Sequence, residues 1–249
     1  MGFAEAEATW TDRLRLVRNV VRQEVVARQL AEVACDGARV LDVGCGQGTQ
    51  LLRLAGGGRA LTGVDPSVRL LGRLTADAEA LGVAVEVHCA DLEGAGDAVG
   101  GAVFDLVCAH GLLMYLGDRR GALRQLADRV APGGLLSVTF RNADALAMRP
   151  GVRGDWPAAV AAFGRSTYVN ELGVDARADR LVDIDADLAA IDFSVHAWFG
   201  IRVLSDGVRS DTQAPVGVEL AALLDAEDLA GRRDPYRALG SQLHVIARR

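Results

Sequence analysis

The sequence contains no lysine, so arginine supplies all 27 basic side chains among its 249 residues. With 33 acidic residues the formal net charge is −6, which does not indicate a nucleic-acid-binding surface over the whole protein. A guanidinium is planar and donates hydrogen bonds in a fork. Every cationic side chain can therefore bind a carboxylate or phosphate with two parallel hydrogen bonds.

Cysteine and long apolar runs are also scarce. The four cysteines form no C-x-x-C pair and have no histidine at zinc-ligand spacing, so we expect free thiols and no metal site. The longest uncharged run, 106–117, is shorter than the roughly 18 to 20 residues of a membrane-spanning helix, and the N-terminal segment is acidic, unlike a signal peptide. We expect a cytoplasmic protein with no membrane partner; no feature of the sequence indicates an oligomeric state.

Strand-like and helix-like segments alternate along the chain. Half of the residues are hydrophobic and 24% are charged, which is typical of a globular protein. Helices are predicted after Leu51 and Pro66 and near 10–33, 119–130, 155–163, 183–190 and 218–229, and strands near 40–43, 61–65, 83–89, 104–109, 135–140, 193–203 and 242–247. This order predicts an α/β fold: a doubly wound, Rossmann-like sheet of seven strands with an antiparallel last strand and helices on both faces. We expect a single domain over 1–249, with a lid over the acceptor at about 142–178, where the alternation lapses.

A glycine-rich turn follows the first predicted strand. Residues 40–49 read V-L-D-V-G-C-G-Q-G-T, with glycine at 44, 46 and 48. Glycine tolerates positive φ and lets a ligand lie against bare backbone. The dinucleotide fingerprint is G-x-G-x-x-G, so the spacing here disfavours a nicotinamide oxidoreductase. The absence of lysine also removes the Ser/Tyr/Lys set that many such enzymes use.

Asp65 ends the second predicted strand, 17 residues after Gly48. An acid at this position can accept hydrogen bonds from both hydroxyls of a ribose. The segments V-L-D-V-G-C-G-Q-G and G-V-D-P-S together resemble motifs I and II of the class I S-adenosylmethionine (SAM)-dependent methyltransferases. That resemblance implies SAM as the cofactor.

Further segments resemble one bacterial family, the tRNA 5-carboxymethoxyuridine methyltransferases, which form the methyl ester of a wobble-uridine carboxylate. The resemblance covers most of the chain and is weakest in the lid. It rests on Leu14-Arg15, the Gly44 turn, Asp65, His88-Cys89-Ala90, His110 leading into Leu112-Leu113-Met114-Tyr115-Leu116, Asn142-Ala143, Gly200-Ile201-Arg202-Val203, Asp234-Pro235-Tyr236, Leu239-Gly240 and His244-Val245.

Carried over by position, the resemblance implies a set of SAM-binding residues: Arg15, Gly44, Cys45, Gly46, Asp65, Pro66, Asp91, Leu92 and His110. Arg15 would pair with the methionyl carboxylate in a bidentate fork. Asp91 would read the amino edge of the adenine, or it is a plain cap of the following helix.

The acceptor decides which side chains the chemistry needs. A carboxylate acceptor is ionised at neutral pH and needs no base, so cationic and polar anchors matter most; the substrate-binding candidates are Arg141, Asn142, Arg202 and Tyr236. If the acceptor is an alcohol or phenol, His110 is the candidate catalytic base. The fourth predicted strand ends in A-H-G-L rather than [DN]-P-P-[YFW], which disfavours N-methylation of nucleobases.

Two alternatives to tRNA methylation remain. Phosphate contacts dominate nucleic-acid affinity, and residues 158–165 of the lid contain one arginine and no lysine. A small carboxylate or hydroxyl metabolite is therefore the competing acceptor. The third possibility is a SAM-binding protein without turnover, because methyl transfer needs few side chains.

Overall fold

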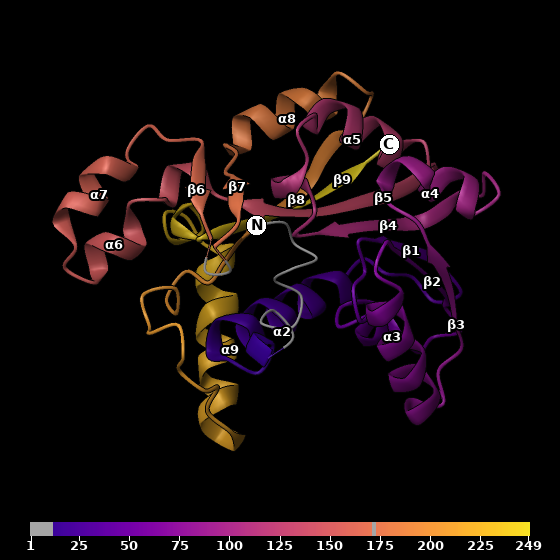
Figure 1. Ribbon diagram of the computed structural model, residues 1–249, viewed down its shortest axis with the longest axis horizontal. Helices are drawn as coiled ribbons and strands as arrows, with labels where there is room; N and C mark the ends of the chain where they lie inside the picture. Colours follow the sequence, from indigo (N-terminus) through magenta and orange to yellow (C-terminus); the bar gives the residue numbers. More distant parts are fainter. Residues whose placement is uncertain (1–11, 171–172) are drawn as a thin grey trace. The chain divides into compact units, whose positions relative to one another are not determined.

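The computed structural model describes residues 12–170 and 173–249 (Figure 1). Contacts between Cα atoms divide the chain into two compact units. The first, here called the sheet unit, contains residues 27–139, 184–197 and 245–249; the second, here called the arginine unit, contains the described residues of 12–26, 140–183 and 198–244. A single domain over 1–249 stays a prediction.

Seven strands form one mixed sheet: β1 (Arg39–Val43), β2 (Ala60–Asp65), β3 (Val85–Cys89), β4 (Phe104–His110), β5 (Val130–Arg141), β8 (Ser194–Ile201) and β9 (Gln242–Arg248). Their order is β3-β2-β1-β4-β5-β9-β8. The β1–β2, β1–β4, β2–β3 and β4–β5 pairs are parallel, and the last strand is antiparallel. The predicted doubly wound sheet is confirmed.

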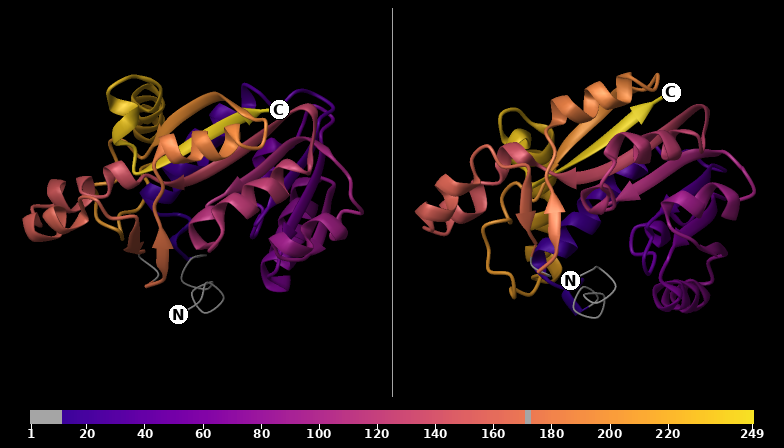
Figure 2. Two further views of the ribbon diagram at one scale, coloured as in Figure 1. Left: turned by 90° about the horizontal axis from the view of Figure 1, so that it is seen from above. Right: turned by 45° about the horizontal axis from the view of Figure 1, so that its top comes forward.

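The helices of the described chain are α2 (Val17–Ala31), α3 (Val68–Leu81), α4 (Leu92–Ala98), α5 (Arg119–Ala127), α6 (Met148–Val152), α7 (Trp156–Ala162), α8 (Leu181–Ala189) and α9 (Gly217–Arg232). In the sheet unit, α3 lies on one face of the sheet and α5 and α8 lie on the other (Figures 1 and 2). Local sequence explains where α3 begins and ends. Ser67 caps it by accepting from Leu70 N at 3.2 Å, and Gly82 ends it with φ of 66°.

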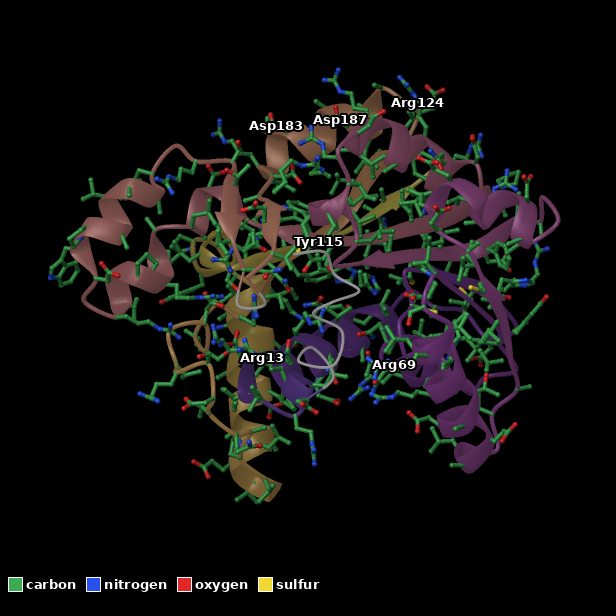
Figure 3. All side chains as sticks on the ribbon, viewed as in Figure 1. Arg13, Arg69, Tyr115, Arg124, Asp183 and Asp187 are labelled. Atoms are coloured by element: carbon green, nitrogen blue, oxygen red, sulfur yellow. The ribbon has the colours of Figure 1, made fainter. Side chains whose placement is uncertain are left out.

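An ion-pair group joins α5 to α8. Asp187 of α8 is buried and accepts from Arg119 Nε and Arg120 Nε, each at 2.6 Å. Figure 3 shows Asp183 and Asp187 on α8 and Arg124 on α5. Because a buried carboxylate is costly unless it is paired, these two contacts fix the position of α8 against α5 within the sheet unit.

Four details differ from the sequence prediction. The helix expected after Leu51 is a single short turn, η1 (Leu51–Leu54), and the break expected at 131–134 belongs to β5. The lid contains α6 and a two-stranded antiparallel sheet of β6 (Thr167–Val169) and β7 (Asp175–Arg177), neither of which was predicted. The helix predicted over 10–33 has its first two residues outside the described residues, and α2 begins at Val17.

Candidate active site

The carboxyl ends of four neighbouring strands carry most of the predicted cofactor-binding residues. In the order β3-β2-β1-β4, Val43 pairs with Val64, Asp65 with Cys89 and Asp42 with Cys108. Four features therefore lie at or just after the carboxyl ends of neighbouring strands: the turn that begins at Gly44, and the residues Asp65, Asp91 and His110. The chain reverses direction across the sheet between β1 and β4, and such switch points are where open α/β sheets bind ligands.

The turn after β1 requires its glycines. Gly44, Gly46 and Gly48 have φ values of 72°, 57° and 74°, a left-handed conformation that side chains disfavour. A Cβ at Gly48 would also clash with Leu74 Cδ1 of α3. The spacing read from the sequence thus corresponds to a tight turn packed against the next helix.

The backbone N–H groups of this turn point into the protein. Gly44 N and Cys45 N donate to Val64 O at 2.8 and 3.2 Å, and Gly48 N donates to Cys45 O at 2.9 Å. A pyrophosphate is bound by N–H groups that face the ligand. The hydrogen bonds of the turn therefore disfavour a dinucleotide, in agreement with the glycine spacing.

Asp65 joins the turn to the end of β2. Its carboxylate is buried and accepts from Gly46 N at 2.8 Å and from Ser67 N at 2.9 Å. Two backbone contacts thus fix the orientation of the acid that we expect to bind the ribose.

Asp42 is a second acid at this edge, on β1. Burial, with a smaller contribution from the charge of Asp65, raises its pKa from 3.8 to about 8. Asp42 therefore holds a proton at neutral pH, so the turn carries the negative charge of Asp65 without a second one beside it. Burial and the nearby acids also raise the thiol pKa of Cys45 well above its usual range, which makes this residue a packing group rather than a nucleophile.

His110 ends β4, where it pairs with Thr139 of β5. Its half-buried ring places Nε2 2.8 Å from Ser137 Oγ, and the direction of the proton depends on the tautomer. This contact holds the ring in place. A role as a base stays a prediction.

The structure shows where three more of the predicted SAM-binding residues lie: Asp91, Leu92 and Pro66. Asp91 is the N-cap of α4 and accepts from Gly94 N at 2.9 Å, which confirms the capping interpretation; Leu92 is the first residue of that helix. Pro66 is exposed next to Asp65. Adenine contacts by these residues stay a prediction.

Arg15 belongs to the arginine unit, where it is exposed in a turn before α2. Its contact with SAM also stays a prediction.

The substrate-binding candidates differ in what they contact. Arg141 and Arg202 are both buried and both form ion pairs with Asp206, at 3.8 and 3.5 Å. Asn142 donates from Nδ2 to Ala238 O and Gly240 O, both at 2.9 Å, and accepts from Asp144 N at 3.1 Å. These backbone contacts use both Nδ2 donors of its amide and one acceptor site of its oxygen. Substrate binding by Asn142 stays a prediction.

Tyr236, the fourth candidate, is 54% exposed in η4 (Tyr236–Leu239). Sequence reasoning missed Arg149, Tyr168 and Asp206, which join the pair of arginines. The four-residue spacing of Arg202 and Asp206 was the one signal for this group in the sequence.

Among residues 12–170 and 173–249, no three His, Cys, Asp or Glu side chains are grouped as metal ligands. Within those same ranges no helix combines the length and the apolar character that crossing a membrane requires.

Comparisons with known proteins show the family of the chain. Residues 40–134 match a family model described as a methyltransferase domain. The chain is 30% identical to the tRNA 5-carboxymethoxyuridine methyltransferase of Escherichia coli strain K12 over 236 residues, which are 94% of this chain and 88% of that relative. It is also 35% identical over 107 residues to a ubiquinone biosynthesis O-methyltransferase of Rhizobium johnstonii, covering 43% of this chain and 42% of the relative.

Solved structures share the fold at lower sequence identity. A SAM-dependent methyltransferase from Mesorhizobium loti has a TM-score of 0.56 at 18% identity and covers 90% of this chain and 96% of its own. The magnesium protoporphyrin IX methyltransferase from Synechocystis, solved with bound S-adenosylhomocysteine, has a TM-score of 0.55 at 16% identity, over 93% and 82%. With a relative that is 30% identical over nearly the full length of both chains, the protein belongs to the SAM-dependent methyltransferases, in the family of the tRNA 5-carboxymethoxyuridine methyltransferases.

Proposed function

We propose that this enzyme transfers the methyl group of SAM to an oxygen acceptor, and that the acceptor is the carboxylate of a carboxymethoxyuridine in tRNA. The observation that carries the methyl-donor half of the proposal is Asp65, which two backbone N–H groups hold at the end of β2 beside the glycine turn. The similarity to the Escherichia coli tRNA enzyme supports the acceptor half.

The residues present suit SAM. Asp65 would hold the ribose hydroxyls, and the turn at Gly44 and Gly46, without side chains, would make room for the methionyl group. SAM supplies a sulfonium whose methyl group is displaced in line. The protein contributes alignment, since holding two reacting groups in the right geometry removes roughly 7 to 11 kcal/mol of barrier.

A carboxylate acceptor would need no proton removed from it. A carboxyl group with a pKa of about 4 is ionised at neutral pH, so its oxygen already carries the attacking lone pair. His110, fixed by Ser137, is then a positioning group. Its role as a base would be required only for an alcohol or phenol.

The second candidate is O-methylation of a small metabolite. Two observations favour it: the similarity to ubiquinone biosynthesis O-methyltransferases over 107 residues, and the lid segment 158–165, whose one cationic side chain is Arg165. A tRNA substrate would need phosphate contacts elsewhere on the protein.

Cofactor binding is tested by thermal unfolding with SAM, S-adenosylhomocysteine, NAD and NADP. A ligand at 100 times its Kd stabilises by about 2.7 kcal/mol, and we expect this effect with the first two ligands alone. Asp65→Ala should abolish it, because the ribose loses its acceptor. Asp77→Ala, which removes an exposed acid from α3 of the same unit, should leave it unchanged. An unchanged SAM effect in Asp65→Ala would remove Asp65 from the ribose site.

The acceptor is tested by transfer of label from tritiated SAM to fractionated small RNA and to a metabolite extract of the source organism. We expect label in the tRNA fraction, as an ester that mild alkali hydrolyses. Label confined to the metabolites would contradict the tRNA assignment and favour the second candidate.

A further inference from the structure

The helices α6 and α7 form a hairpin that exposes three large apolar side chains. Within the arginine unit, this hairpin lies at one end, beyond β6 and β7 (Figure 1). Ala159 of α7 is buried beside Gly151 of α6, so the two helices pack against each other there. On α7 and at its C-terminal end, Trp156, Val160 and Phe163 are 67%, 73% and 75% exposed. We call these three residues the α7 face.

The α7 face is a continuous apolar surface. Its members are four and three residues apart, a spacing that places side chains on the same side of a helix. Residues 156–163 contain no charged side chain. Because an aromatic side chain has roughly 150 to 250 Å² of surface, the exposed part of the face amounts to roughly 400 Å². Exposed patches of several hundred Å² typically mark interaction sites.

The hairpin that carries the α7 face is fixed to the rest of the arginine unit. Arg149 of α6 binds Asp206 in a bidentate fork, with Nε–Oδ2 and Nη2–Oδ1 both at 2.8 Å. Arg153, at the end of α6, donates from Nε to Gly207 O at 3.1 Å. Binding to a surface that is already ordered loses less conformational entropy than binding to a mobile loop.

Two exposed charges of opposite sign flank the α7 face. Asp155 precedes α7 and caps it by accepting from Ala158 N at 3.1 Å, and Arg165 follows the helix. Neither side chain forms an ion pair with another described residue. If two copies of α7 pack antiparallel, each Asp155 lies beside the Arg165 of the other copy. The surface is thus complementary to itself in charge as well as in apolar character.

We propose that the α7 face is the interface of a homodimer, in which two copies of this chain pack their α7 helices antiparallel about a two-fold axis. In such an interface, if position i faces position j, then j also faces i. Pairing position 155 with position 165 therefore places Val160, midway between them, opposite Val160 of the second copy. Phe163 then lies opposite Pro157 of the second copy. This interface does not depend on which acceptor the enzyme methylates.

The size of the surface predicts a weak dimer. Two α7 faces, together with the neighbouring exposed apolar groups of both hairpins, would bury a total of roughly 1,000 Å², which is at the low end for specific interfaces. Since interfaces of about 1,600 Å² begin at micromolar affinity, we expect a dimer that dissociates in the micromolar range.

The oligomeric state of the full chain is measured by sedimentation equilibrium. We expect the mass to rise from the 26.2 kDa of one chain towards twice that value as the protein concentration increases from about 1 to about 100 μM. SAM is left out, so the result does not depend on cofactor binding.

Substitutions at exposed positions test which surface forms the dimer. Val160→Asp brings two carboxylates face to face at the axis and should weaken the dimer at least about 100-fold. Phe163→Ser removes an aromatic side chain from both copies and should weaken it about 10-fold or more. Val218→Ser is the matched control: Val218 is 89% exposed on α9 of the same unit, and its replacement should leave the dimer unchanged.

The charge pair tests the antiparallel arrangement. Arg165→Glu places a carboxylate beside Asp155 of the second copy and should weaken the dimer. Adding Asp155→Asn keeps the helix cap and removes this repulsion. The double variant should therefore dimerise about 3-fold or more tightly than Arg165→Glu alone, because two like-charge contacts are relieved in each dimer.

Cysteine cross-linking tests the position of the axis. The exposed cysteines Cys35 and Cys89 are first replaced by serine. In this background Val160→Cys should form a disulfide between two copies under mild oxidation, because cysteines at facing positions are within bonding distance. Ala158→Cys is the control, since Ala158 is exposed on the opposite side of α7 and should give no cross-linked dimer.

A monomeric mass at every concentration would overturn the proposal, and so would a dimer that Val160→Asp leaves intact. Equal cross-linking of Val160→Cys and Ala158→Cys would also contradict it. If Val160→Asp does not fold, Phe163→Ser decides the question by the same criterion. Flotation of a monomeric protein with phosphatidylglycerol vesicles, lost in Trp156→Ser, would assign the α7 face to a lipid surface instead of a second copy.

Discussion

Asp42 shows how one proton can contribute to the stability of this protein. The unfolded chain gives up this proton near pH 4, whereas the folded chain keeps it until about pH 8. Between these values the folded state binds more protons, so the free energy of unfolding falls as the pH rises. The fall is at most about 1.4 kcal/mol for each pH unit, and it ends above pH 8.

Asn in place of Asp42 keeps the shape of the side chain and removes the titration. We expect Asp42→Asn to gain stability relative to the native protein as the pH rises from about 5 to about 8. Urea unfolding across this range measures the difference. Any cost of burying the amide is the same at every pH, so parallel profiles for the two proteins would contradict the raised pKa.

Single residues were predictable where a local backbone requirement selects them. Gly44, Gly46 and Gly48 adopt positive φ, and Asp65 ends a strand at a fixed distance along the chain, so both signals lie in short stretches of sequence. Arg149 and Asp206 are 57 residues apart, and their contact depends on how the arginine unit folds. No local pattern reports such a contact.

Among the elements, α4 is short and depends on its N-cap, Asp91. Asp91 accepts from Gly94 N, and replacing such a cap with alanine costs about 1 kcal/mol. Asp91→Ala should therefore lower stability by about that amount, whereas Asp91→Asn should keep it, because asparagine caps equally well. Urea unfolding of both variants provides the measurement.

The same pair of variants separates capping from cofactor binding. If Asp91 also binds the adenine through its charge, Asp91→Asn loses SAM affinity while it keeps the stability of the native protein. Equal SAM affinity in Asp91→Asn and the native protein would leave capping as the role of this acid.

Elements with strong periodicity were predicted well and short ones were not. The apolar run of β4 and the amphipathic pattern of α9 each span seven or more residues, which is long enough to define a period. The strands β6 and β7 have three residues each, which is too short for an alternation of apolar and polar residues to be recognised in the sequence. The apolar pattern at Leu51–Leu54 is too short to form an α-helix, so this segment forms only the turn η1.

At the scale of the whole molecule, the last strand is the one that joins β5 to β8. Leu243, Val245, Ile246 and Ala247 of β9 are all buried. Burying each large apolar side chain contributes about 1.5 to 3 kcal/mol, so losing three of them removes about 5 kcal/mol or more, comparable with the total stability of many proteins.

A chain that ends at Ser241 should therefore show no cooperative thermal unfolding when it is followed by circular dichroism. A chain that lacks Arg249 alone is the control. It should unfold close to the native protein, because it loses only the hydrogen bonds from Arg249 Nη1 to Val130 O at 3.1 Å and from Arg249 N to Gly134 O at 3.4 Å among those of the described residues. Cooperative unfolding of the shorter chain would mean that β8 is stable without its neighbour.

The place of β9 in the sheet also has a consequence for biosynthesis. Domains generally begin to fold from the N-terminus during translation, and β1 to β5 can pair as they emerge from the ribosome. The strand that β8 needs, β9, follows it in the sequence and is therefore synthesised after it. Until β9 has emerged from the ribosome, the nascent chain exposes an unpaired strand edge that chaperones can shield from aggregation.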